Sequence, residues 1–208
     1  MFKKFKFVLL GSCNTGKTCI VYRYINKSFL DVFHSTIGGA FINKMITKDN
    51  IDYTLDIWDT AGQERYISLL PMYYRNSNIV FLCFDITDRL TKIEKDIDFW
   101  IKQLDTHNDS INRTVLLIAT KIDLINDISL EYTLDALKLK YYSYSIITTS
   151  SKENINIDEI FNIGLEIAIE KEKEKEIKEE VTLPLGQTLI LSHIVPKKTI
   201  WKTYCSIL

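Results

Sequence analysis

Gly11-Ser12-Cys13-Asn14-Thr15-Gly16-Lys17-Thr18 is the stretch that decides how this chain folds. It follows an apolar run at 5–10 that is typical of a buried strand, and it precedes residues 18–25, which are typical of a helix. A loop of the form G-x-x-x-x-G-K-T in this context surrounds a polyphosphate with backbone N–H groups, and the helix dipole adds positive potential. The sequence therefore predicts a nucleotide-binding loop.

The side chains of this loop have distinct expected roles. Lys17 is expected to contact the β- and γ-phosphates, and the Thr18 hydroxyl is expected to be a ligand of Mg²⁺. The predicted phosphate site as a whole comprises Cys13, Asn14, Thr15, Gly16, Lys17, Thr18 and Cys19.

The composition of the chain limits the classes of protein to which it can belong. The chain has 208 residues, and its 26 basic and 27 acidic residues nearly cancel, so no global field points to nucleic acid as a partner. The four cysteines, at 13, 19, 83 and 205, form no disulfide framework, which favours a reducing compartment. No signal peptide or membrane-spanning run is recognisable. We expect a cytosolic protein, unless its C-terminal end attaches it to a membrane.

The rest of the chain alternates between strand-like and helix-like segments. Further strands are predicted at 41–47, 51–58, 79–84, 115–119 and 145–147, with a turn at 48–50. Helices are predicted at 66–75, 93–104, 130–139 and 157–168. This alternation indicates an α/β fold in which helices cover both faces of a mostly parallel six-stranded sheet, with ligands at the carboxyl ends of the strands.

A second motif, Trp58-Asp59-Thr60-Ala61-Gly62-Gln63-Glu64-Arg65, follows the third predicted strand. An aspartate there can orient water on Mg²⁺, and a glycine lets backbone N–H approach a γ-phosphate. Paired with the phosphate loop, this motif resembles the signature of the small GTPases. The resemblance implies that Asp59 belongs to the metal site, that Gly62 contacts the nucleotide and that Gln63 holds the attacking water.

Two residues before that motif are assigned by the same resemblance. Thr36 falls where the family places the threonine of its first switch, whose hydroxyl ligates Mg²⁺ and whose N–H contacts the γ-phosphate. Both switch loops would then be tied to the γ-phosphate and released on hydrolysis. Phe29 matches the aromatic that covers the guanine edge, although packing under the sheet is an alternative for it.

The choice of base is predicted from two later loops. Thr120-Lys121-Ile122-Asp123 resembles the family's Asn-Lys-x-Asp, with Thr120 as in the Rho branch. The Asp123 carboxylate can accept N1–H and the exocyclic amine of guanine, and adenine offers neither donor. Lys121 would lie along the base. The loop Thr149-Ser150-Ser151-Lys152 resembles the last guanine loop, which implies that Ser150 lies in the site, Ser151 N–H meets O6 and Lys152 covers the ring.

Within the superfamily the resemblance is to the Rab GTPases, and most of all to their early-endosomal subgroup. The resemblance to Rabs in general is carried by Ile37-Gly38-x-x-Phe41, Glu64-Arg65-Tyr66 and Tyr73-Tyr74-Arg75. The resemblance to the subgroup is carried by Ser35-Thr36-Ile37-Gly38 with Ala40-Phe41, and by the run from Ser68-Leu69 to Pro71-Met72-Tyr73-Tyr74-Arg75. It implies that effectors recognise Ile37, Gly38, Phe41, Trp58 and Tyr73. It further implies an exchange factor, a GTPase-activating protein, a GDP-dissociation inhibitor, a prenylation escort and a monomeric G domain that controls endosomal vesicle traffic.

The C-terminal part is predicted to be a separate tail. We divide the chain into a G domain at 1–170 and a tail at 171–208, which begins with a solvated Glu/Lys extension of the last helix. An apolar patch at 189–195 could engage the escort or dock onto the domain. The last four residues, Cys205-Ser206-Ile207-Leu208, form a C-a-a-X box that favours geranylgeranyl transfer to Cys205. The expected location is the cytoplasmic face of endomembranes, in exchange with the cytosol.

Two other functions stay open. Thr120 and the C-a-a-X end are compatible with a Rho- or Ras-like signalling switch, although no Rho-type insertion separates Asp123 from Thr149. The non-glycine residues Cys13 and Asn14 are compatible with a binding module locked in one nucleotide state, whereas Gln63 argues for hydrolysis.

Overall fold

The computed structural model describes residues 3–30, 36, 38–62, 70–106 and 113–181, with side chains up to 178. The chain divides into two units, 1–173 and 174–208, and their boundary falls inside the last helix. The fold and the site described below belong to the first unit.

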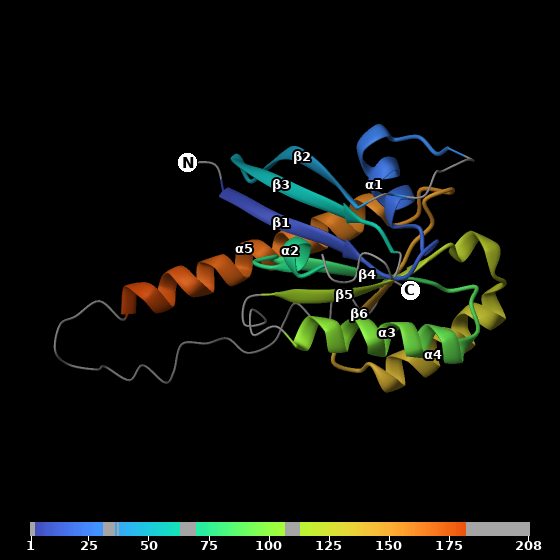
Figure 1. Ribbon diagram of the computed structural model, residues 1–208. Coiled ribbons are helices and arrows are strands. Elements are labelled where there is room, and N and C mark those ends of the chain that lie inside the picture. The colour runs from blue at the N-terminus through green and yellow to red at the C-terminus, as the bar shows by residue number, and fades with distance from the viewer. Residues whose placement is uncertain (1–2, 31–35, 37, 63–69, 107–112, 182–208) are drawn as a thin grey trace. The chain divides into compact units, whose positions relative to one another are not determined.

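A six-stranded sheet forms the centre of the first unit (Figure 1). Across the sheet the strands follow the order β2-β3-β1-β4-β5-β6, and only the β2–β3 pair is antiparallel. The mostly parallel six-stranded sheet is therefore confirmed. In chain order the strands are β1 (Lys3–Leu10), β2 (Gly39–Lys48), β3 (Ile51–Thr60), β4 (Ile79–Asp85), β5 (Thr114–Thr120) and β6 (Ser145–Thr148).

Helices cover both faces of this sheet, as predicted. Figure 1 shows α3 and α4 on one face, and α1 with the first part of α5 on the other. A short 3₁₀ turn, η3, follows β5. The helical segments are α1 (Lys17–Asn26), α2 (Leu70–Tyr74), α3 (Leu90–Asp105), η3 (Ile122–Leu124), α4 (Asp127–Lys140) and α5 (Ile157–Val181). None of these described helices is long and apolar enough to cross a membrane.

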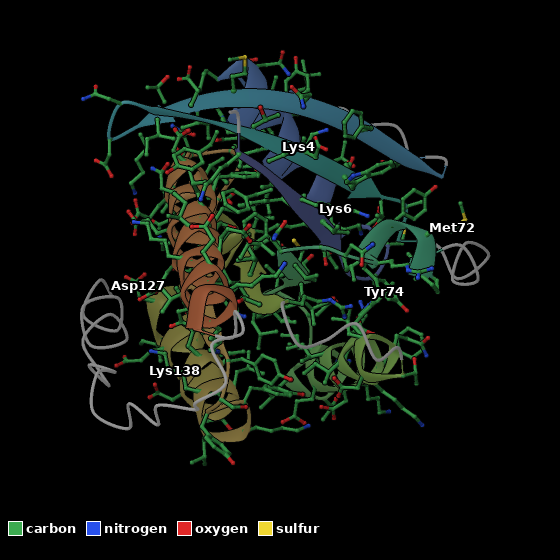
Figure 2. All side chains as sticks on the ribbon, turned by 90° about the vertical axis from the view of Figure 1, so that its left-hand side faces the viewer. Lys4, Lys6, Met72, Tyr74, Asp127 and Lys138 are labelled. Atoms are coloured by element: carbon green, nitrogen blue, oxygen red, sulfur yellow. The ribbon has the colours of Figure 1, made fainter. Side chains whose placement is uncertain are left out.

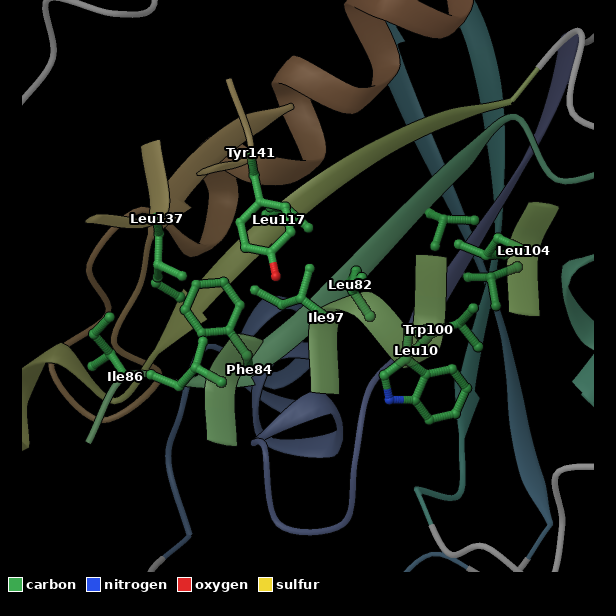
Figure 3. Packing of buried hydrophobic residues seen from close by; sticks show 14 of the residues in the cluster. Leu10, Leu82, Phe84, Ile86, Ile97, Trp100, Leu104, Leu117, Leu137 and Tyr141 are labelled. Carbon is green, nitrogen blue, oxygen red and sulfur yellow. The ribbon is translucent and has the colours of Figure 1, made fainter. Parts of the chain in front are cut away.

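The central strands are buried on both faces, which explains their continuous apolar sequences. On the α1 face, the ring of Phe7 in β1 stacks on Phe161 of α5, and Tyr24 of α1 stacks on the same ring. On the other face, side chains of β4 and β5 pack against α3 and α4, as Figure 3 shows for Phe84 and Leu117. Each such burial contributes about 1.5–3 kcal/mol, so the core holds the strand ends in place.

Several element boundaries differ from the sequence-based expectation. The predicted turn at 48–50 is wrong by one residue: both strands continue through Lys48 and Ile51, and only Asp49 and Asn50 turn, with φ of 52° and 59°. Two residues with positive φ form the tight hairpin connection whose twist matches that of the strands. The predicted helix at 66–75 is described only as α2, because 66–69 lie outside the described residues.

Helix α4 begins earlier than predicted. It starts at Asp127 and not at residue 130, because the side chain of Asn126 accepts a hydrogen bond from the Ser129 N–H, at 2.9 Å, and caps the helix. The polar first turn contributes little to the apolar pattern, which explains why that pattern placed the start too late.

Candidate functional site

The loop between β1 and α1 has a backbone that glycine makes possible. Gly11 and Gly16 have φ of 138° and 82°, and Asn14 also has a positive φ, of 63°. A Cβ atom on Gly11 would lie 2.1 Å from the carbonyl oxygen of Cys83 in β4, so only glycine fits there. The loop therefore lies directly against the sheet and leads into α1.

Lys17 is the buried cation at the centre of this loop. Its side-chain Nζ donates to the carbonyl oxygens of Gly11, at 2.8 Å, and of Ser12, at 2.7 Å. The Thr15 hydroxyl donates to the same Ser12 oxygen at 3.0 Å. Burial lowers the pKa of the Lys17 ammonium. Negative charge on nearby groups, Asp59 among them, opposes this shift without cancelling it. An ammonium held by neutral carbonyls is well suited to a negatively charged ligand. Cys13 is exposed beside it, and Cys19 is partly buried in α1.

Three oxygen-bearing side chains from separate elements meet beside Lys17. Thr18 Oγ1 donates to Asp59 Oδ2 at 2.7 Å and lies 2.8 Å from the hydroxyl of Thr36. The other oxygen of Asp59, Oδ1, is buried and has no hydrogen-bond partner among the described residues. Burial raises the pKa of Asp59, although the bond from Thr18 and the charge of Lys17 oppose this. A hard cation such as Mg²⁺ prefers oxygen ligands of this kind.

The fit of a cation here does not depend on a cage of acidic side chains. In the described part of the chain, no group of three or more His, Cys, Asp or Glu residues is arranged to hold a metal. One carboxylate and two hydroxyls instead leave room for phosphate oxygens and water, which is how Mg²⁺ is usually held in nucleotide sites.

Gly62 brings the chain after β3 directly over the phosphate loop. A Cβ atom on Gly62 would lie 2.5 Å from the Ser12 carbonyl and 2.6 Å from Lys17 Nζ, so a side chain at Gly62 could not be accommodated without moving the loop. The predicted catalytic residue Gln63 follows it but lies outside the described residues.

A second cluster forms where β5 and β6 end. Thr120 Oγ1 donates to the carbonyl oxygens of Thr15, at 2.9 Å, and of Phe84, at 3.0 Å. The Ser150 hydroxyl donates to Asp123 Oδ1 at 2.6 Å, and Ser150 is fully buried. The structure thus brings the two predicted base loops together and links one of them to the phosphate loop.

Lys121 is held by a residue that the motif does not contain. Its Nζ lies 2.5 Å from Asp85 Oδ2 at the end of β4. Burial would raise the pKa of Asp85, but hydrogen bonds from Lys121 and Thr87 outweigh it and hold this pKa below its ordinary value. The aspartate remains ionised and fixes the direction of the lysine side chain.

Sequence reasoning also missed Arg23 on α1. Its Nε donates to the Ser151 carbonyl at 2.6 Å, and Nη2 donates to the Lys152 carbonyl at 2.7 Å. The same guanidinium lies 5.8 Å from the ring centre of Phe29. Arg23 therefore joins the last predicted guanine loop to α1 and to the aromatic assigned to the guanine edge. No local sequence signal reveals its bonds to this loop, since Ser151 and Lys152 lie 128 and 129 residues further along the chain.

Comparison with known proteins agrees with this geometry. The sequence pattern of the Ras family matches residues 6–170. The chain belongs to the Ras family. Among its relatives is a ras-related protein described as Rab-5B from Dictyostelium discoideum, 42% identical over 163 residues, which cover 76% of this chain and 72% of that protein. Rab-24 of the same organism is 36% identical over 159 residues, covering 75% and 76%. The Ras-like GTP-binding protein RYL2 of Yarrowia lipolytica is 31% identical over 198 residues, covering 90% and 92%.

This Ras-family chain is of the Rab type, and its three predicted effector aromatics lie side by side. The ring centres of Phe41 and Trp58 are 5.0 Å apart, and those of Trp58 and Tyr73 are 5.7 Å apart. A Cβ atom on Gly39 would lie 2.9 Å from the Tyr73 ring, so the start of β2 passes closely over it. Phe41 is half exposed, at 50%. Gly38, with a φ of 73°, adjoins this cluster, since a Cβ atom on it would lie 3.8 Å from the Tyr73 hydroxyl oxygen. Ile37 lies outside the described residues.

Proposed function

We propose that this Rab-type protein switches between GTP- and GDP-bound states at the site around Lys17 and recruits effectors in the GTP state to direct vesicle traffic. It is a GTPase, which hydrolyses GTP to GDP and phosphate. The observation that carries the proposal is the meeting of Thr18, Thr36 and Asp59, in which one buried Asp59 oxygen has no hydrogen-bond partner among the described residues. A buried carboxylate oxygen without a donor is costly unless a ligand completes the site.

The residues present fit Mg²⁺. When bound, this cation neutralises the negative charge on the β- and γ-phosphates. In this chain the hydroxyls of Thr18 and Thr36 would hold it, and Asp59 would orient water on it. Support comes from the 2.7 Å and 2.8 Å contacts that already join the three side chains.

The loop residues position the phosphates. Lys17 would exchange its bonds to the Gly11 and Ser12 carbonyls for bonds to the β- and γ-phosphate oxygens, which are stronger because both partners are charged. Gly62, whose close approach to Lys17 leaves no space for a side chain, would present its N–H to the γ-phosphate. We assign to Gln63 the orientation of the attacking water, as the family resemblance implies.

The base loops select guanine. Asp123 would accept N1–H and the exocyclic amine, with the Ser150 hydroxyl on Oδ1 holding its orientation. Lys121 and Lys152 would cover the ring, and Phe29 its edge, with the Ser151 N–H meeting O6. Held in place by Asp85 and Arg23, these loops would be arranged before the nucleotide arrives.

The nucleotide state would be transmitted to effectors through two neighbouring stretches of chain, one with Thr36 and Gly38 and the other with Ala61. Thr36 contacts the cation site, and Gly38, two residues later, accepts a hydrogen bond from the Ala61 N–H at 2.8 Å. Phe41, Trp58 and Tyr73 lie immediately beyond. Loss of the γ-phosphate would release Thr36 and Gly38, which lie next to the three aromatic side chains. Exchange factors, GTPase-activating proteins, a GDP-dissociation inhibitor and a prenylation escort are the regulators we propose.

Hydrolysis can be tested in a single turnover. Gln63→Leu should retain GTP and hydrolyse it at least about 10-fold more slowly, since water orientation is lost while phosphate binding is kept. The nucleotide content of the purified protein and the rate of phosphate release are the measurements. Equal rates for the two proteins would refute the role of Gln63, and a wild type without hydrolysis would favour the locked binding module.

Membrane attachment is a separate part of the proposal. We infer that Cys205 carries a prenyl group that holds the protein on the cytoplasmic face of endosomal membranes. Cys205→Ser should leave hydrolysis unchanged and shift the protein from the membrane to the soluble fraction of its own cell, because it removes the lipid, whose burial contributes about 0.8 kcal/mol per CH₂ group. A mutant that still sediments with membranes would show that something other than the lipid holds it there.

A further inference from the structure

The outer side of α4 carries large apolar side chains that nothing in the described part of the chain covers. Ile128, Tyr132 and Leu139 are 83%, 71% and 83% exposed. Spacings of four and seven residues place them in one row along the helix. Asp135 is also exposed in this row. We call these four residues the α4 stripe. Tyr142, 87% exposed, follows at the end of the helix.

The stripe is not needed to attach α4 to the fold. The opposite side of the helix already buries Leu134 and Leu137 in the core. Single exposed apolar residues are ordinary on protein surfaces, but an aligned row of large ones marks a contact surface. None of the proposed nucleotide or effector residues belongs to it, so its role is separate from theirs.

Charges beside the stripe change sign along the helix. Asp127 and Glu131 lie in the first half, and Lys138 lies in the last turn. At 100° per residue, all three fall on the same flank of the stripe. Figure 2 shows Asp127 and Lys138 toward opposite ends of α4. Lys140 is paired with Asp98 at 2.9 Å. In contrast, the three flanking residues have no ion-pair partner among the residues that the structure describes.

We propose that the α4 stripe binds the α4 stripe of a second copy of this chain in an antiparallel, two-fold arrangement. With the axis crossing the helix between Thr133 and Leu134, Ile128 packs against the partner's Leu139. The Tyr132 hydroxyl reaches the partner's Asp135 carboxylate. Each contact occurs twice, as two-fold symmetry requires.

The flanking charges select this occupant and this direction. In antiparallel pairing, Asp127 faces the partner's Lys138, and the same flanks of the two helices meet. Parallel two-fold pairing would instead turn this flank toward the partner's opposite flank, and Asp127 and the partner's Lys138 would not meet. An anionic membrane would be repelled by Asp127, Glu131 and Asp135. The surface is therefore complementary to itself.

The dimer is weak and reversible. Four side chains of this size bury on the order of 500 Å² per copy, so the total lies below the roughly 1,200 Å² of stable interfaces. The monomeric G domain expected from the sequence is then the state in dilute solution. Dimers form where the local concentration is high, as among copies attached to one vesicle.

Sedimentation of the full chain with GDP tests the association itself. We expect the wild type to associate reversibly as its concentration rises to roughly 1 mM, in the range of weak interfaces. Leu139→Ser should lower the association constant about 10-fold, because it removes an anchor from both halves of the contact. Met72→Ser is the matched control, since Met72 is 73% exposed on α2 and outside the stripe, and it should change nothing.

Mixing two charge variants tests the antiparallel arrangement. Asp127→Lys alone and Lys138→Glu alone should each weaken association about five-fold, because each places like charges opposite one another twice. An equimolar mixture of the two variants should restore it, since both contacts then join opposite charges. A loss of helix stability could not be restored by mixing.

Three results would overturn the proposal. One is a wild type that stays monomeric up to roughly 1 mM, where even weak interfaces associate. Another is a mixture that associates no better than either variant alone. The third is binding of the stripe to vesicles of neutral lipid, lost in Leu139→Ser, without self-association in solution.

Discussion

The phosphate half and the base half of the nucleotide site satisfy their polar groups in different ways. In the phosphate half, the Lys17 ammonium donates to two backbone carbonyls and a hydroxyl, and Asp59 Oδ1 has no partner among the described residues. In the base half, side chains pair with one another: the Ser150 hydroxyl with Asp123, and Lys121 with Asp85.

This difference indicates where the ligand contributes most. Binding energy is largest where charged groups gain new partners and smallest where a preorganised site exchanges few contacts. We therefore expect the phosphate half to respond to the nucleotide state and the base half to recognise guanine in either state. Thr120 joins the two, since its hydroxyl belongs to a base loop and bonds to Thr15 of the phosphate loop.

The largest effect is expected from Lys17→Met. Without its ammonium the protein should bind GDP at least about 100-fold more weakly, because charge-assisted hydrogen bonds to two phosphates contribute about 1.5–3 kcal/mol each. The free energy of unfolding without nucleotide should fall by less than about 1 kcal/mol, or rise, since a buried charge is replaced by an apolar group of similar size.

Calorimetric titration with GDP and urea unfolding measure the two quantities. Lys102→Met, at an exposed position of α3, serves as the control and should alter neither. Affinity within a few-fold of the wild type would mean that the phosphate half does not depend on its buried cation.

A smaller effect is expected in the base half from Asp123→Asn. GTP affinity should fall about 10- to 100-fold, because one of two acceptors for guanine becomes a donor. Xanthosine triphosphate should gain affinity, since its C2 oxygen accepts from the new amide. The Ser150 hydroxyl can still donate to the amide oxygen, so unfolding should change by less than about 1 kcal/mol.

Competition binding with the guanine, xanthine and adenine nucleotides measures this change. Asp105→Asn, at an exposed position of α3, is the matched control. An undiminished preference for guanine in Asp123→Asn would contradict the assigned role of this carboxylate.

The smallest effect is expected from Thr120→Val, which removes the hydrogen bond between the base half and the phosphate half. It leaves the carbonyls of Thr15 and Phe84 without this donor and should lower the free energy of unfolding by about 1–2 kcal/mol. GDP should dissociate a few-fold faster, because the phosphate loop loses an anchor. Urea unfolding and the rate of release of a fluorescent GDP analogue measure both. Unchanged release with reduced stability would mean that the halves act independently.

Much of the fold was predictable because most of its elements carry either a continuous apolar run or apolar residues at a regular spacing. The run at 79–84 is typical of a buried strand, and the apolar repeats at 93–104 are typical of an amphipathic helix. Helix boundaries that depend on one capping contact were harder to predict. The cap of α4 is the hydrogen bond from the Ser129 N–H to the Asn126 side chain, and the pattern of apolar residues does not indicate this bond. The hairpin was misplaced by one residue because Lys48 continues the strand.

The site was predictable where a motif is local and not where contacts are distant. Lys17 and Thr18 are adjacent in one loop, so their chemistry could be inferred from spacing. Arg23 and Asp85 were missed because their partners, Ser151 and Lys121, lie in other elements. Trp100 of α3 was missed for the same reason: its indole N–H lies 3.4 Å from the Ser12 hydroxyl. The roles of the predicted residues toward the nucleotide remain predictions.

By itself the sequence determined the kinds of group available: a glycine-rich loop with a lysine, two threonines and an aspartate that we expect to bind phosphate and cation, and an aspartate that we expect to bind guanine. Only the tertiary structure decided which of them meet. Parallel strands end at the same edge of a sheet, and Thr18, Thr36 and Asp59 become neighbours there although 41 residues separate the first from the last. The exposed row on α4 likewise emerged only from packing, because buried and exposed apolar residues look alike in a sequence.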